Sequence, residues 1–231
     1  YQDREGKIWV GTFGGYRIID PVTLKVKNVE VNTTPGSRNN GIAILSFFQD
    51  KKQNMWVGTN NGLLRIDART KQKEIFVHNS SNKNSISDNS IRAIVADKQG
   101  RVFFGTNDGL NMLLQDEKSF RRFSRSSGNK SSLSEDIIYA VSLTPDGALW
   151  VGTEDGVGIF DSEMLSFSSI RPDRRKAFSL SHKSIKSIFT AKTGIIWLGT
   201  HQGGVNKFDP NLPLFNLKRS SPFNPKGLSS P

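Results

Sequence analysis

The chain of 231 residues contains no cysteine. Disulfide scaffolds, thiolate zinc sites and cysteine nucleophiles are therefore excluded, although the compartment stays open because a large β domain needs no disulfides. Long hydrophobic runs are also missing: the longest apolar stretch, Ile42 to Phe48, is interrupted by Ser46. A stretch of that length is far too short to cross a bilayer.

Acidic residues are scarce, with 21 Asp and Glu against 32 Lys and Arg and a net charge of +11. This excess suits an anionic partner (nucleic acid, a membrane surface or an acidic glycan) and equally a solvated basic surface. The basic residues concentrate in predicted outer strands and loops: Arg121, Arg122, Arg125, Lys130, Arg171, Arg174, Arg175, Lys176, Lys218 and Arg219. Nucleic-acid binding would require aromatic residues interleaved with these bases. The aromatic residues lie elsewhere in the pattern, so we expect no nucleic-acid partner.

No stretch shows a convincing helical period, but a repeat of 47 residues runs through the whole chain. An aromatic-x-Gly-Thr segment recurs five times, at 8–12, 55–59, 102–106, 149–153 and 196–200. Its glycines, at positions 11, 58, 105, 152 and 199, are each 47 residues apart, and isoleucines at 44, 91, 138 and 185 keep the same interval. Five in-phase copies of a compound motif indicate a repeat architecture.

Each copy is predicted to form four short strands. An apolar, β-branched strand such as 90–96 precedes a turn such as 97–100, where Asp and Gly are favoured. The Trp-x-Gly-Thr strand follows, and a tight hairpin such as 60–62, closed by a left-handed glycine, leads to the third strand. A fourth strand and a long polar return loop complete the copy. Repeated four-stranded units of this length predict a β-propeller.

We expect an all-β fold, with a single propeller segment over 1–231. Its five four-stranded antiparallel blades are predicted at about 1–35, 36–82, 83–129, 130–176 and 177–220, with 221–231 leading into a further blade. The first copy begins near the end of its first strand, so its innermost strand is expected to be missing. A closed ring of such blades would contain about seven. The chain is therefore predicted to be an open fragment of a larger propeller.

All four tryptophans occupy one position of the repeat, where the third copy has Phe103. An aromatic residue that recurs in every copy is more readily explained as core than as a ligand platform, because aromatic side chains dominate core burial. The recurrent Gly-Thr pair is likewise interpreted as a packing and turn device. None of these positions is therefore a candidate site residue.

The unit Ile-x-x-Ile, Asp-x-x-Gly, Trp-x-Gly-Thr and x-x-Gly-Leu with a trailing Asp resembles the two-component regulator propeller repeat. It is clearest at 91–109, 138–161 and 194–209, and the resemblance covers all five copies. The third copy departs from it with Phe103 for Trp and Leu114 for the trailing Asp, and the fifth has its Asp one residue late, at Asp209. These departures predict local packing changes and no change of fold.

The resemblance implies the extracytoplasmic, periplasmic sensor domain of a hybrid two-component histidine kinase, of the kind common in gut bacteria that degrade polysaccharides. It implies an oligosaccharide ligand that controls glycan-utilisation genes, contact with the remainder of the sensor protein, and a homodimer of the full-length protein. The parent would be a histidine kinase, whereas this segment would not be an enzyme. We expect no cofactor, because the segment has no kinase or phosphate-binding pattern.

Candidate ligand-binding residues lie where the return loops and hairpins emerge together, and central pockets are the default sites. One position of the first strand changes chemistry between copies, as Leu45, Arg92, Tyr139 and Lys186. Because packing would favour one residue type there, Arg92, Tyr139 and Lys186 are predicted to form a polar channel wall that contacts ligand. Polar hairpin and loop residues are predicted to join them: Asn61, Asp108, Asp155, His182 and His201.

Other interpretations stay open. Turn positions are polar in any protein, so solvent exposure explains each of these loop residues singly. His182 and His201 could ligate zinc or act as base and acid, but no third ligand accompanies them at metal spacing, so no metal site is predicted. A protein-interaction propeller is one alternative function. A lyase-type enzyme is another, because some propellers that resemble antibiotic-inactivating lyases use a histidine in such a place. The basic loops favour an acidic oligosaccharide if the sensor interpretation holds.

Overall fold

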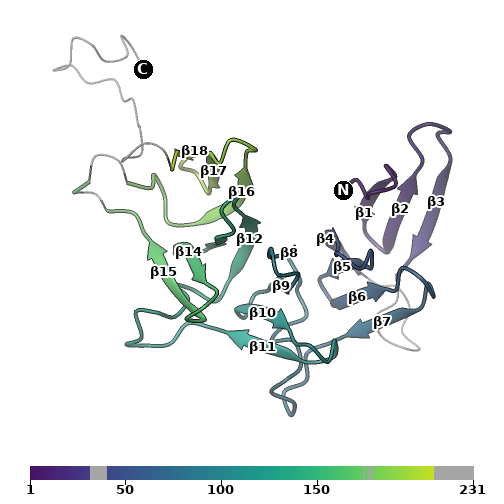
Figure 1. Ribbon diagram of the computed structural model, residues 1–231, viewed down its shortest axis with the longest axis horizontal. Coiled ribbons are helices and arrows are strands. Elements are labelled where there is room, and N and C mark those ends of the chain that lie inside the picture. The colour runs from purple at the N-terminus through teal and green to yellow at the C-terminus, as the bar shows by residue number, and fades with distance from the viewer. Residues whose placement is uncertain (32–40, 174, 177–178, 211–231) are drawn as a thin grey trace, which may run out of the picture.

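The structure is a computed structural model that describes residues 1–31, 41–173, 175–176 and 179–210. These residues form 18 strands, and no helix able to cross a membrane occurs among them. The strands make five antiparallel sheets, each from strands consecutive in the chain (Figure 1). The sheets contain, in order, β1 (Ile8–Thr12), β2 (Gly15–Ile19) and β3 (Val26–Glu30); β4 (Ile44–Gln49), β5 (Met55–Thr59), β6 (Gly62–Ile66) and β7 (Lys73–Phe76); β8 (Ala93–Ala96), β9 (Val102–Gly105), β10 (Leu110–Leu113) and β11 (Phe120–Phe123); β12 (Ile138–Leu143), β13 (Leu149–Thr153), β14 (Gly156–Asp161) and β15 (Ser166–Ile170); β16 (Ile185–Thr190), β17 (Ile196–Thr200) and β18 (Val205–Phe208).

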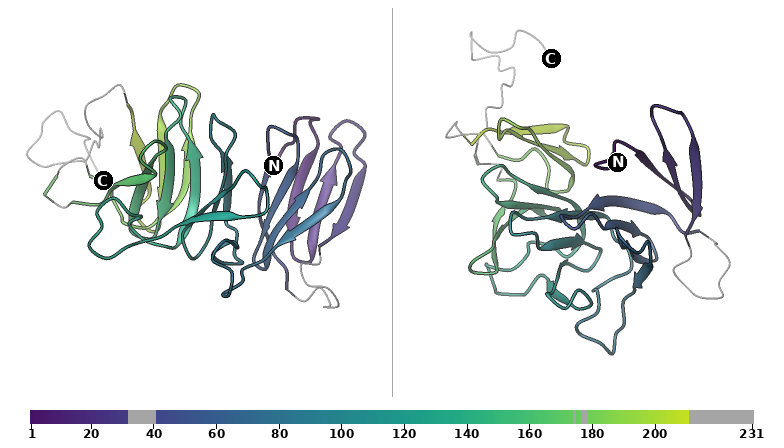
Figure 2. Two further views of the ribbon diagram at one scale, coloured as in Figure 1. Left: turned by 60° about the horizontal axis from the view of Figure 1, so that its bottom comes forward. Right: turned by 45° about the vertical axis from the view of Figure 1, so that its right-hand side comes forward.

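The sheets follow one another around an arc, with the first strands of neighbouring copies in contact along its inner side (Figures 1 and 2). The first and fifth sheets stand at the two ends of this arc, and no strand of one pairs with a strand of the other among the described residues. The predicted all-β propeller of antiparallel blades, open rather than closed, is confirmed. The number of blades in a complete ring stays a prediction.

The first and last sheets have three strands each in the described part of the chain. In the first, the inner strand is reduced to an isolated bridge between Gln2 and Ile8, as predicted. In the fifth, the expected fourth strand and the lead-in at 221–231 lie outside the described residues. The sheets fall within the five predicted blade ranges, but the boundaries between blades stay a prediction.

The hairpins between the second and third strands of each copy are closed by the recurrent threonine. In the third sheet the Thr106 hydroxyl donates to the Gly109 carbonyl at 2.8 Å and accepts the Asp108 N–H at 3.1 Å. The predicted left-handed glycine is present, with φ of 113° at Gly62, 89° at Gly109 and 93° at Gly156. The fifth hairpin contains one more residue, and its left-handed glycine is Gly204. The late Asp209 follows from this extra residue.

The recurrent glycine and isoleucine are two halves of one contact between sheets. A Cβ placed on Gly105 would lie 2.6 Å from Cγ2 of Ile138 in the next sheet, and one on Gly11 would lie 2.9 Å from Ile44. The isoleucine backbone bonds at the same place, since the Ile138 N–H donates to the Thr106 carbonyl at 2.9 Å. The glycine therefore lets the next inner strand approach closely, which explains why both residues recur together.

The aromatic position of the repeat forms the core between sheets. Trp56 and Phe103 are fully buried, and their rings meet Phe104 and Phe160 at centroid distances of 5.2 Å and 5.5 Å. Trp150 is buried too, against Phe208 of the fifth sheet. Trp9 is half-buried. Trp197, in the last sheet, is 40% exposed, so the core prediction does not extend to it in the described structure.

The departures of the third copy are local, as predicted. In the second sheet the Trp56 Nε1 donates to the buried Asp50 carboxylate at 2.9 Å. Phe103 has no such donor, and the Arg101 Nε takes over by donating to Asp97 at 2.5 Å. Each carboxylate is satisfied, so the sheet keeps its form.

Candidate functional site

The connections between strands emerge at the two opposite ends of the sheets, because neighbouring strands are antiparallel. They therefore form two opposite faces of the molecule. The hairpins and return loops share what we name the hairpin face, and backbone bonds tie them together. The N–H groups of the hairpin glycines Gly62, Gly109 and Gly156 donate to the carbonyls of Asn89, Asp136 and Lys183 at 2.6–2.7 Å. The turns within 50–54 and 97–101, between first and second strands, emerge on the opposite side, which we name the turn face. The predicted site therefore lies on the hairpin face.

Arg92, Tyr139 and Lys186, from three consecutive copies, meet on the arc's inner side, and we name them the polar ladder. The Lys186 Nζ lies 3.4 Å from the centroid of the Tyr139 ring, and the Arg92 guanidinium carbon lies 5.3 Å from it. The sequence predicted that these three side chains share one wall, and the structure brings them together. Their role in ligand binding stays a prediction. Leu45, at the same position of the second copy, is 39% exposed.

Irregular strand pairing explains why these side chains gather. The pairing of β12 with β13 shifts between Ile138 and Ala140, and that of β16 with β17 shifts between Ile185 and Ser187. Tyr139 and Lys186 are the extra residues of these bulges. A bulge redirects a side chain out of the regular alternation of a strand. Tyr139 and Lys186 are consequently half-buried rather than packed in the core, and Arg92, just before β8, is half-buried too.

The first residues of the third and fourth hairpins contact the ladder. The Arg92 Nε donates to Asn107 Oδ1 at 2.7 Å, and the Lys186 Nζ donates to Glu154 Oε2 at 3.0 Å. The Ser184 hydroxyl donates to the same Glu154 oxygen at 2.9 Å. Asn107 and Glu154 occupy one repeat position, 47 residues apart. Neither was singled out as a site residue from the sequence, although their shared phase with His201 was a signal that could have found them.

Glu154 is the most perturbed acid of the hairpin face. Partial burial alone would raise its pKa, but hydrogen bonds from Lys186, Ser184 and Tyr139 outweigh that effect and lower the pKa to about 2. Burial likewise opposes the charge of Lys186, but its bonds with Tyr139 and Glu154 raise the pKa of the ammonium. The pair is therefore ionised at neutral pH.

Arg92 is the cation of the ladder that lacks an acidic partner. Its Nε is bonded to the neutral amide of Asn107, and no carboxylate lies within 4.0 Å of it in the described ranges. Its terminal nitrogens are thus available to an incoming acceptor. Charge-assisted bonds from a guanidinium to a carboxylate or sulfate are among the stronger hydrogen bonds in proteins.

The second hairpin residues have other contacts. Asp155 pairs with Arg171 of the return loop, with Oδ2 3.0 Å from Nε. The backbone N–H groups of Asn61 and Asp108 donate to the Thr59 and Thr106 hydroxyls at 2.9 and 3.1 Å. The structure shows none of these contacts reaching the ladder. Two successive residues of a tight turn project differently, and here the first one is turned toward the ladder. A part for Asn61, Asp108 and Asp155 in ligand binding stays a prediction.

His182 and His201 do lie together, with ring centroids 5.9 Å apart and edge-to-face geometry. The Ser184 N–H donates to His182 Nδ1 at 3.1 Å, which leaves Nε2 as its outward nitrogen. Within the described ranges, no cluster of three or more potential ligating side chains that could hold a metal ion is found. The pair is therefore best described as a polar edge of the hairpin face, beside Glu154 and Lys186.

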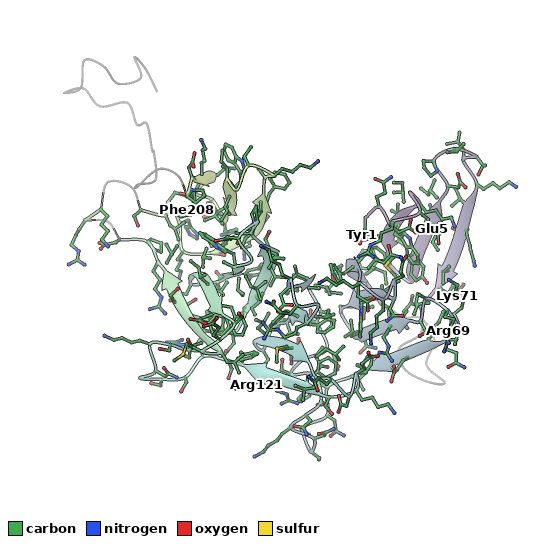
Figure 3. All side chains as sticks on the ribbon, viewed as in Figure 1. Tyr1, Glu5, Arg69, Lys71, Arg121 and Phe208 are labelled. Atoms are coloured by element: carbon green, nitrogen blue, oxygen red, sulfur yellow. The ribbon has the colours of Figure 1, made fainter. Side chains whose placement is uncertain are left out.

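Several basic residues of the loops and outer strands have partners inside the molecule. The Arg122 guanidinium donates to the carbonyls of Ser85 and Asn82 at 2.8 and 3.0 Å, which fixes the return loop. Arg125 pairs with Glu135. Arg121 projects from the outer strand β11 at the rim of the arc (Figure 3). Arg174, Lys218 and Arg219 lie outside the described residues. The net charge is thus a weaker guide to the ligand than the position of Arg92.

The two component regulator propeller family matches the chain at residues 37–61, 85–108 and 132–155. The chain carries two-component regulator propeller repeats. The matched segments contain the return loops, inner strands and hairpins that build the hairpin face. Among the ladder residues, the matches include Arg92 and Tyr139. No curated protein matches the chain.

Solved structures similar to these propeller repeats show the same fold. The extracellular domain of a hybrid two component system from Bacteroides thetaiotaomicron is 19% identical, with a TM-score of 0.50 over 90% of this chain and 33% of that one. PorZ, a surface component of the type-IX secretion system of Porphyromonas gingivalis, is 15% identical, with a TM-score of 0.68 over 90% and 31%. The WD40 β-propeller domain of Doa1 is 15% identical, with a TM-score of 0.62 over 91% and 62%. The chain spans about a third of the first two structures.

Proposed function

We propose that this segment is part of the ligand-sensing, periplasmic region of a hybrid two-component histidine kinase, and that it binds an oligosaccharide to control glycan-utilisation genes. The repeats of the two component regulator propeller family support this proposal, as does the likeness to an extracellular domain of a hybrid two component system. The segment itself binds and does not catalyse. The remainder of the sensor protein and a second copy of it are the proposed partners.

The polar ladder is the observation that carries the proposal. In a sheet packed on both faces, a position at the inner edge would be expected to keep one apolar type from copy to copy. Here it holds two cations, each beside the ring of Tyr139, and one of them, Arg92, is unpaired by any described carboxylate. In ligand sites a small number of placed polar groups fixes the orientation of the ligand, and the ladder supplies such groups on the inner side of the arc.

The same geometry favours an acidic oligosaccharide over a neutral one. The Tyr139 ring is already in contact with the Lys186 ammonium and near the Arg92 guanidinium, so it is not a free platform for stacking a sugar. Recognition then depends on hydrogen bonds and charge. A carboxylate or sulfate group accepts hydrogen bonds from the terminal nitrogens of Arg92. The hydroxyl groups of the sugar form hydrogen bonds with Asn107, Glu154 and the two histidines.

The test is calorimetric titration of the complete extracytoplasmic region with matched acidic and neutral oligosaccharides at two salt concentrations. We expect the acidic ligand to bind more tightly, and Arg92→Ala to weaken it by roughly tenfold or more. Arg121→Ala, which removes an exposed arginine of the outer strand, is the matched control and should leave affinity unchanged. Tight, salt-insensitive binding of a neutral glycan, unchanged by Arg92→Ala or Lys186→Ala, would show the ligand class and the ladder residues to be wrong.

A further inference from the structure

Three apolar residues lie on the hairpin face where the first and second sheets meet. Phe13, in the hairpin between β1 and β2, is 84% exposed, and Leu45, at the ladder position of the second copy, is exposed too. Ala43 forms an isolated antiparallel bridge with Phe13. Residues directly opposite one another in such a pair project to the same side. We name Phe13, Ala43 and Leu45 the apolar patch.

The same three repeat positions are polar where the fourth and fifth sheets meet. Glu154, Ser184 and Lys186 occupy them there, three repeats further along the chain. The Glu154 carboxylate accepts hydrogen bonds from Ser184 and Lys186 at 2.9 and 3.0 Å. Single exposed apolar residues are common at protein surfaces and need no explanation. Here, however, all three positions change from polar to apolar together, which solvent exposure alone does not explain.

A bulge directs Leu45 to the same wall as the polar ladder. The pairing of β4 with β5 shifts between Ile44 and Ser46, so Leu45 is the extra residue, as Tyr139 and Lys186 are in their own sheets. The first strands of neighbouring copies lie side by side along the inner side of the arc (Figure 1). The apolar patch therefore continues the wall that the polar ladder forms.

The backbone at Phe13 is fixed, and the space beside its ring is open. The Gly14 N–H donates to the Ile42 carbonyl at 2.6 Å, and the Thr12 hydroxyl donates to the Gly15 carbonyl at 2.9 Å. Every later copy has a polar residue at the position of Gly14, whereas a Cβ on Gly14 would meet nothing beyond its chain neighbours within 4 Å. No side chain at this second hairpin position therefore shields the ring.

The polar side chain next to the patch is used within the chain. The Asn60 amide nitrogen donates to the Gly41 carbonyl at 2.9 Å, and its Oδ1 accepts the Ala43 N–H at 2.8 Å. Both ends of this amide are thus engaged by the backbone. The apolar patch can therefore recognise the face of a ring, but it offers few groups that distinguish individual hydroxyl groups.

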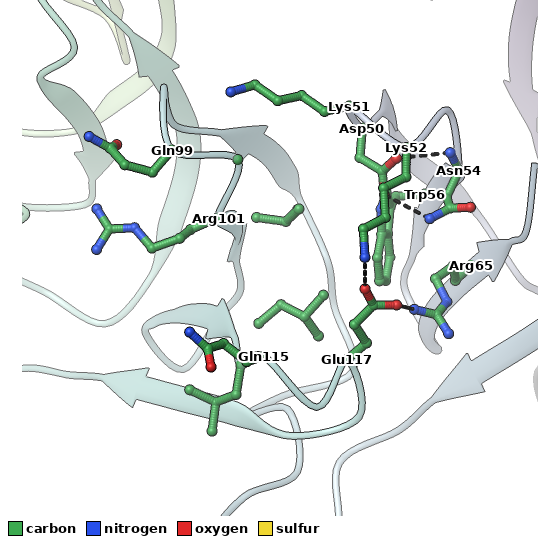
Figure 4. A pocket seen from close by; sticks show the side chains of 14 residues that line it. Asp50, Lys51, Lys52, Asn54, Trp56, Arg65, Gln99, Arg101, Gln115 and Glu117 are labelled. Atoms are coloured by element: carbon green, nitrogen blue, oxygen red, sulfur yellow. Dashed lines mark hydrogen bonds and ion pairs between the residues drawn. The ribbon is translucent and has the colours of Figure 1, made fainter.

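A cleft of about 420 Å³ on the turn face, between the second and third sheets, offers no comparable ring (Figure 4). Its aromatic residue, Trp56, is fully buried, and the Arg65 guanidinium lies 5.6 Å from the ring centroid. The Arg65 Nη1 lies 2.9 Å from the Glu117 carboxylate, and Lys52 pairs with the same carboxylate. The ring and these charges are thus satisfied within the chain.

Phe13, by contrast, has a free ring. It makes no ring contact and no cation contact with another residue of the described ranges. A pyranose with equatorial substituents presents C–H groups on its ring faces, and the face of an aromatic ring is negative enough to attract them. Stacking also removes apolar area of both partners from water. The Phe13 ring is therefore suited to hold the apolar face of a neutral sugar.

We propose that the apolar patch is a subsite for a neutral pyranose unit of the oligosaccharide, whose apolar face stacks on the Phe13 ring and lies against Leu45. This inference rests on the proposed function, because it places a second sugar unit of the same ligand along the wall from Arg92. The inner wall then recognises an acidic unit at the polar ladder and a neutral unit at the apolar patch.

Calorimetric titration of the complete extracytoplasmic region with cellotriose tests the patch, because the rings of this neutral trisaccharide have equatorial substituents. Cellotriose should bind, whereas sorbitol, which has hydroxyl groups but no ring, should not. Phe13→Asn introduces the residue that the second and third copies have at this position, and should weaken cellotriose binding by roughly fivefold or more. Phe13→Trp keeps an aromatic face and should bind at least as tightly as the parent. Val22→Ala, which shortens an exposed apolar side chain on the turn face, is the matched control and should leave binding unchanged.

Parallel titration with glucuronate separates the apolar patch from the polar ladder. Arg92→Ala should weaken glucuronate binding and leave cellotriose binding unchanged, whereas Phe13→Asn should do the reverse. Absence of cellotriose binding, equal binding of sorbitol, or equal effects of Phe13→Asn and Val22→Ala would overturn the patch, as would a loss in Phe13→Trp as large as that in Phe13→Asn. If glucuronate does not bind but cellotriose binding depends on Phe13, the ladder proposal fails and the patch stands.

Discussion

At the scale of single residues, the glycine of each Trp-x-Gly-Thr strand sets how closely two sheets approach. In the Gly105→Ala variant, the new methyl group would meet Cγ2 of Ile138 at 2.6 Å. Because this neighbour belongs to a packed inner strand, the sheets must shift apart. We expect the free energy of unfolding to fall by about 1–3 kcal/mol, as for other overpacked interiors. Chemical denaturation measures it.

A double-mutant cycle makes this prediction specific. Ile138→Ala removes the opposing Cγ2 and creates a cavity of its own, but it should relieve the clash that Gly105→Ala introduces. The two losses should therefore be less than additive, by about 0.5 kcal/mol or more. Strict additivity would mean that the glycine serves only the backbone of its own strand.

Glu154 gives the hairpin face a pH-dependent contribution to stability. Its pKa in the folded chain is about 2, below the unperturbed value of 4.5, so the folded state favours the ionised carboxylate. The stabilisation is fully present above about pH 4.5 and is lost as the pH falls through about 2. Glu154→Gln should therefore destabilise the protein at pH 7, and the difference from the parent should shrink below pH 4.5.

The size of this effect is limited by solvent. The side chains of Glu154 and Lys186 are 36% and 35% exposed, so screening reduces the contribution of the pair to about 0.5–1 kcal/mol at pH 7. Denaturant titrations at several pH values measure it. Glu163→Gln, at an exposed turn without an ion pair in the described structure, is the control. A Glu154→Gln effect that is constant from pH 7 to pH 3 would contradict the assignment.

The residue scale also shows where sequence reasoning fell short. Arg92, Tyr139 and Lys186 could be predicted because they share a repeat position and differ in chemistry. Asn107 and Glu154 share a position too, but the sequence does not show which of two successive turn residues faces inward. That choice depends on the backbone of the hairpin, including a glycine φ near 90°, and on the neighbouring return loop.

At the scale of strands and turns, lysines link neighbouring sheets on the turn face. The Lys51 ammonium donates to the Lys98 carbonyl, and the Lys98 ammonium donates to the Pro145 carbonyl, so each lysine reaches its own repeat position in the next copy. The Lys98 stem lies over Gly147, where a Cβ would be 3.1 Å away from it. The series stops at Pro145, which has no ammonium to donate.

Removal of one such link should loosen the joint between the third and fourth sheets. Lys98→Met keeps the stem and deletes the donor, and we expect a loss of about 1 kcal/mol in the free energy of unfolding. Lys83→Met, in an exposed return loop and without a side-chain bond to the described residues, should change it by less than about 0.5 kcal/mol. Thermal or chemical unfolding measures both. Equal losses in the two variants would show that the ammonium contributes nothing beyond surface charge.

The order of the strands could be predicted from the repeat alone, because every copy tests the same interpretation. The exchange of one hydrogen-bond donor for another within the third copy could not be predicted. Phe103 in place of Trp removes an indole donor, and Arg101, two residues earlier, supplies the bond to Asp97 instead. Such compensation needs the distance between a side chain and its carboxylate, which no spacing in the sequence provides.

At the scale of the whole molecule, the sequence predicts that the excess of basic residues lies in outer strands and loops, and the structure shows that several of these charges have partners within the chain. Several loop arginines pair with acids or carbonyls of their own chain, while Arg92 and Arg101 keep free nitrogens on opposite faces. Composition gives the sum of charges but not which of them are neutralised locally. The cleft lined by Trp56, Leu113 and Glu117 could not be predicted either, because it depends on how the second and third sheets meet.

The stacking of sheets in one direction leaves one face of the fifth sheet without a covering strand among the described residues. In earlier sheets the repeat tryptophan is covered by an aromatic residue of the next sheet, as Trp150 is by Phe208. In the fifth sheet Phe189, Trp197 and Val205 are 65%, 40% and 64% exposed.

Acrylamide should therefore quench the fluorescence of Trp197 far more than that of Trp56 or Trp150, because collisional quenching requires access to the ring. Trp197→Phe should remove most of the easily quenched emission of the 231-residue chain, whereas Trp56→Phe should leave that fraction in place. If Trp197→Phe left quenching unchanged, the face would be covered in solution, and the open arrangement of the fifth sheet would be wrong.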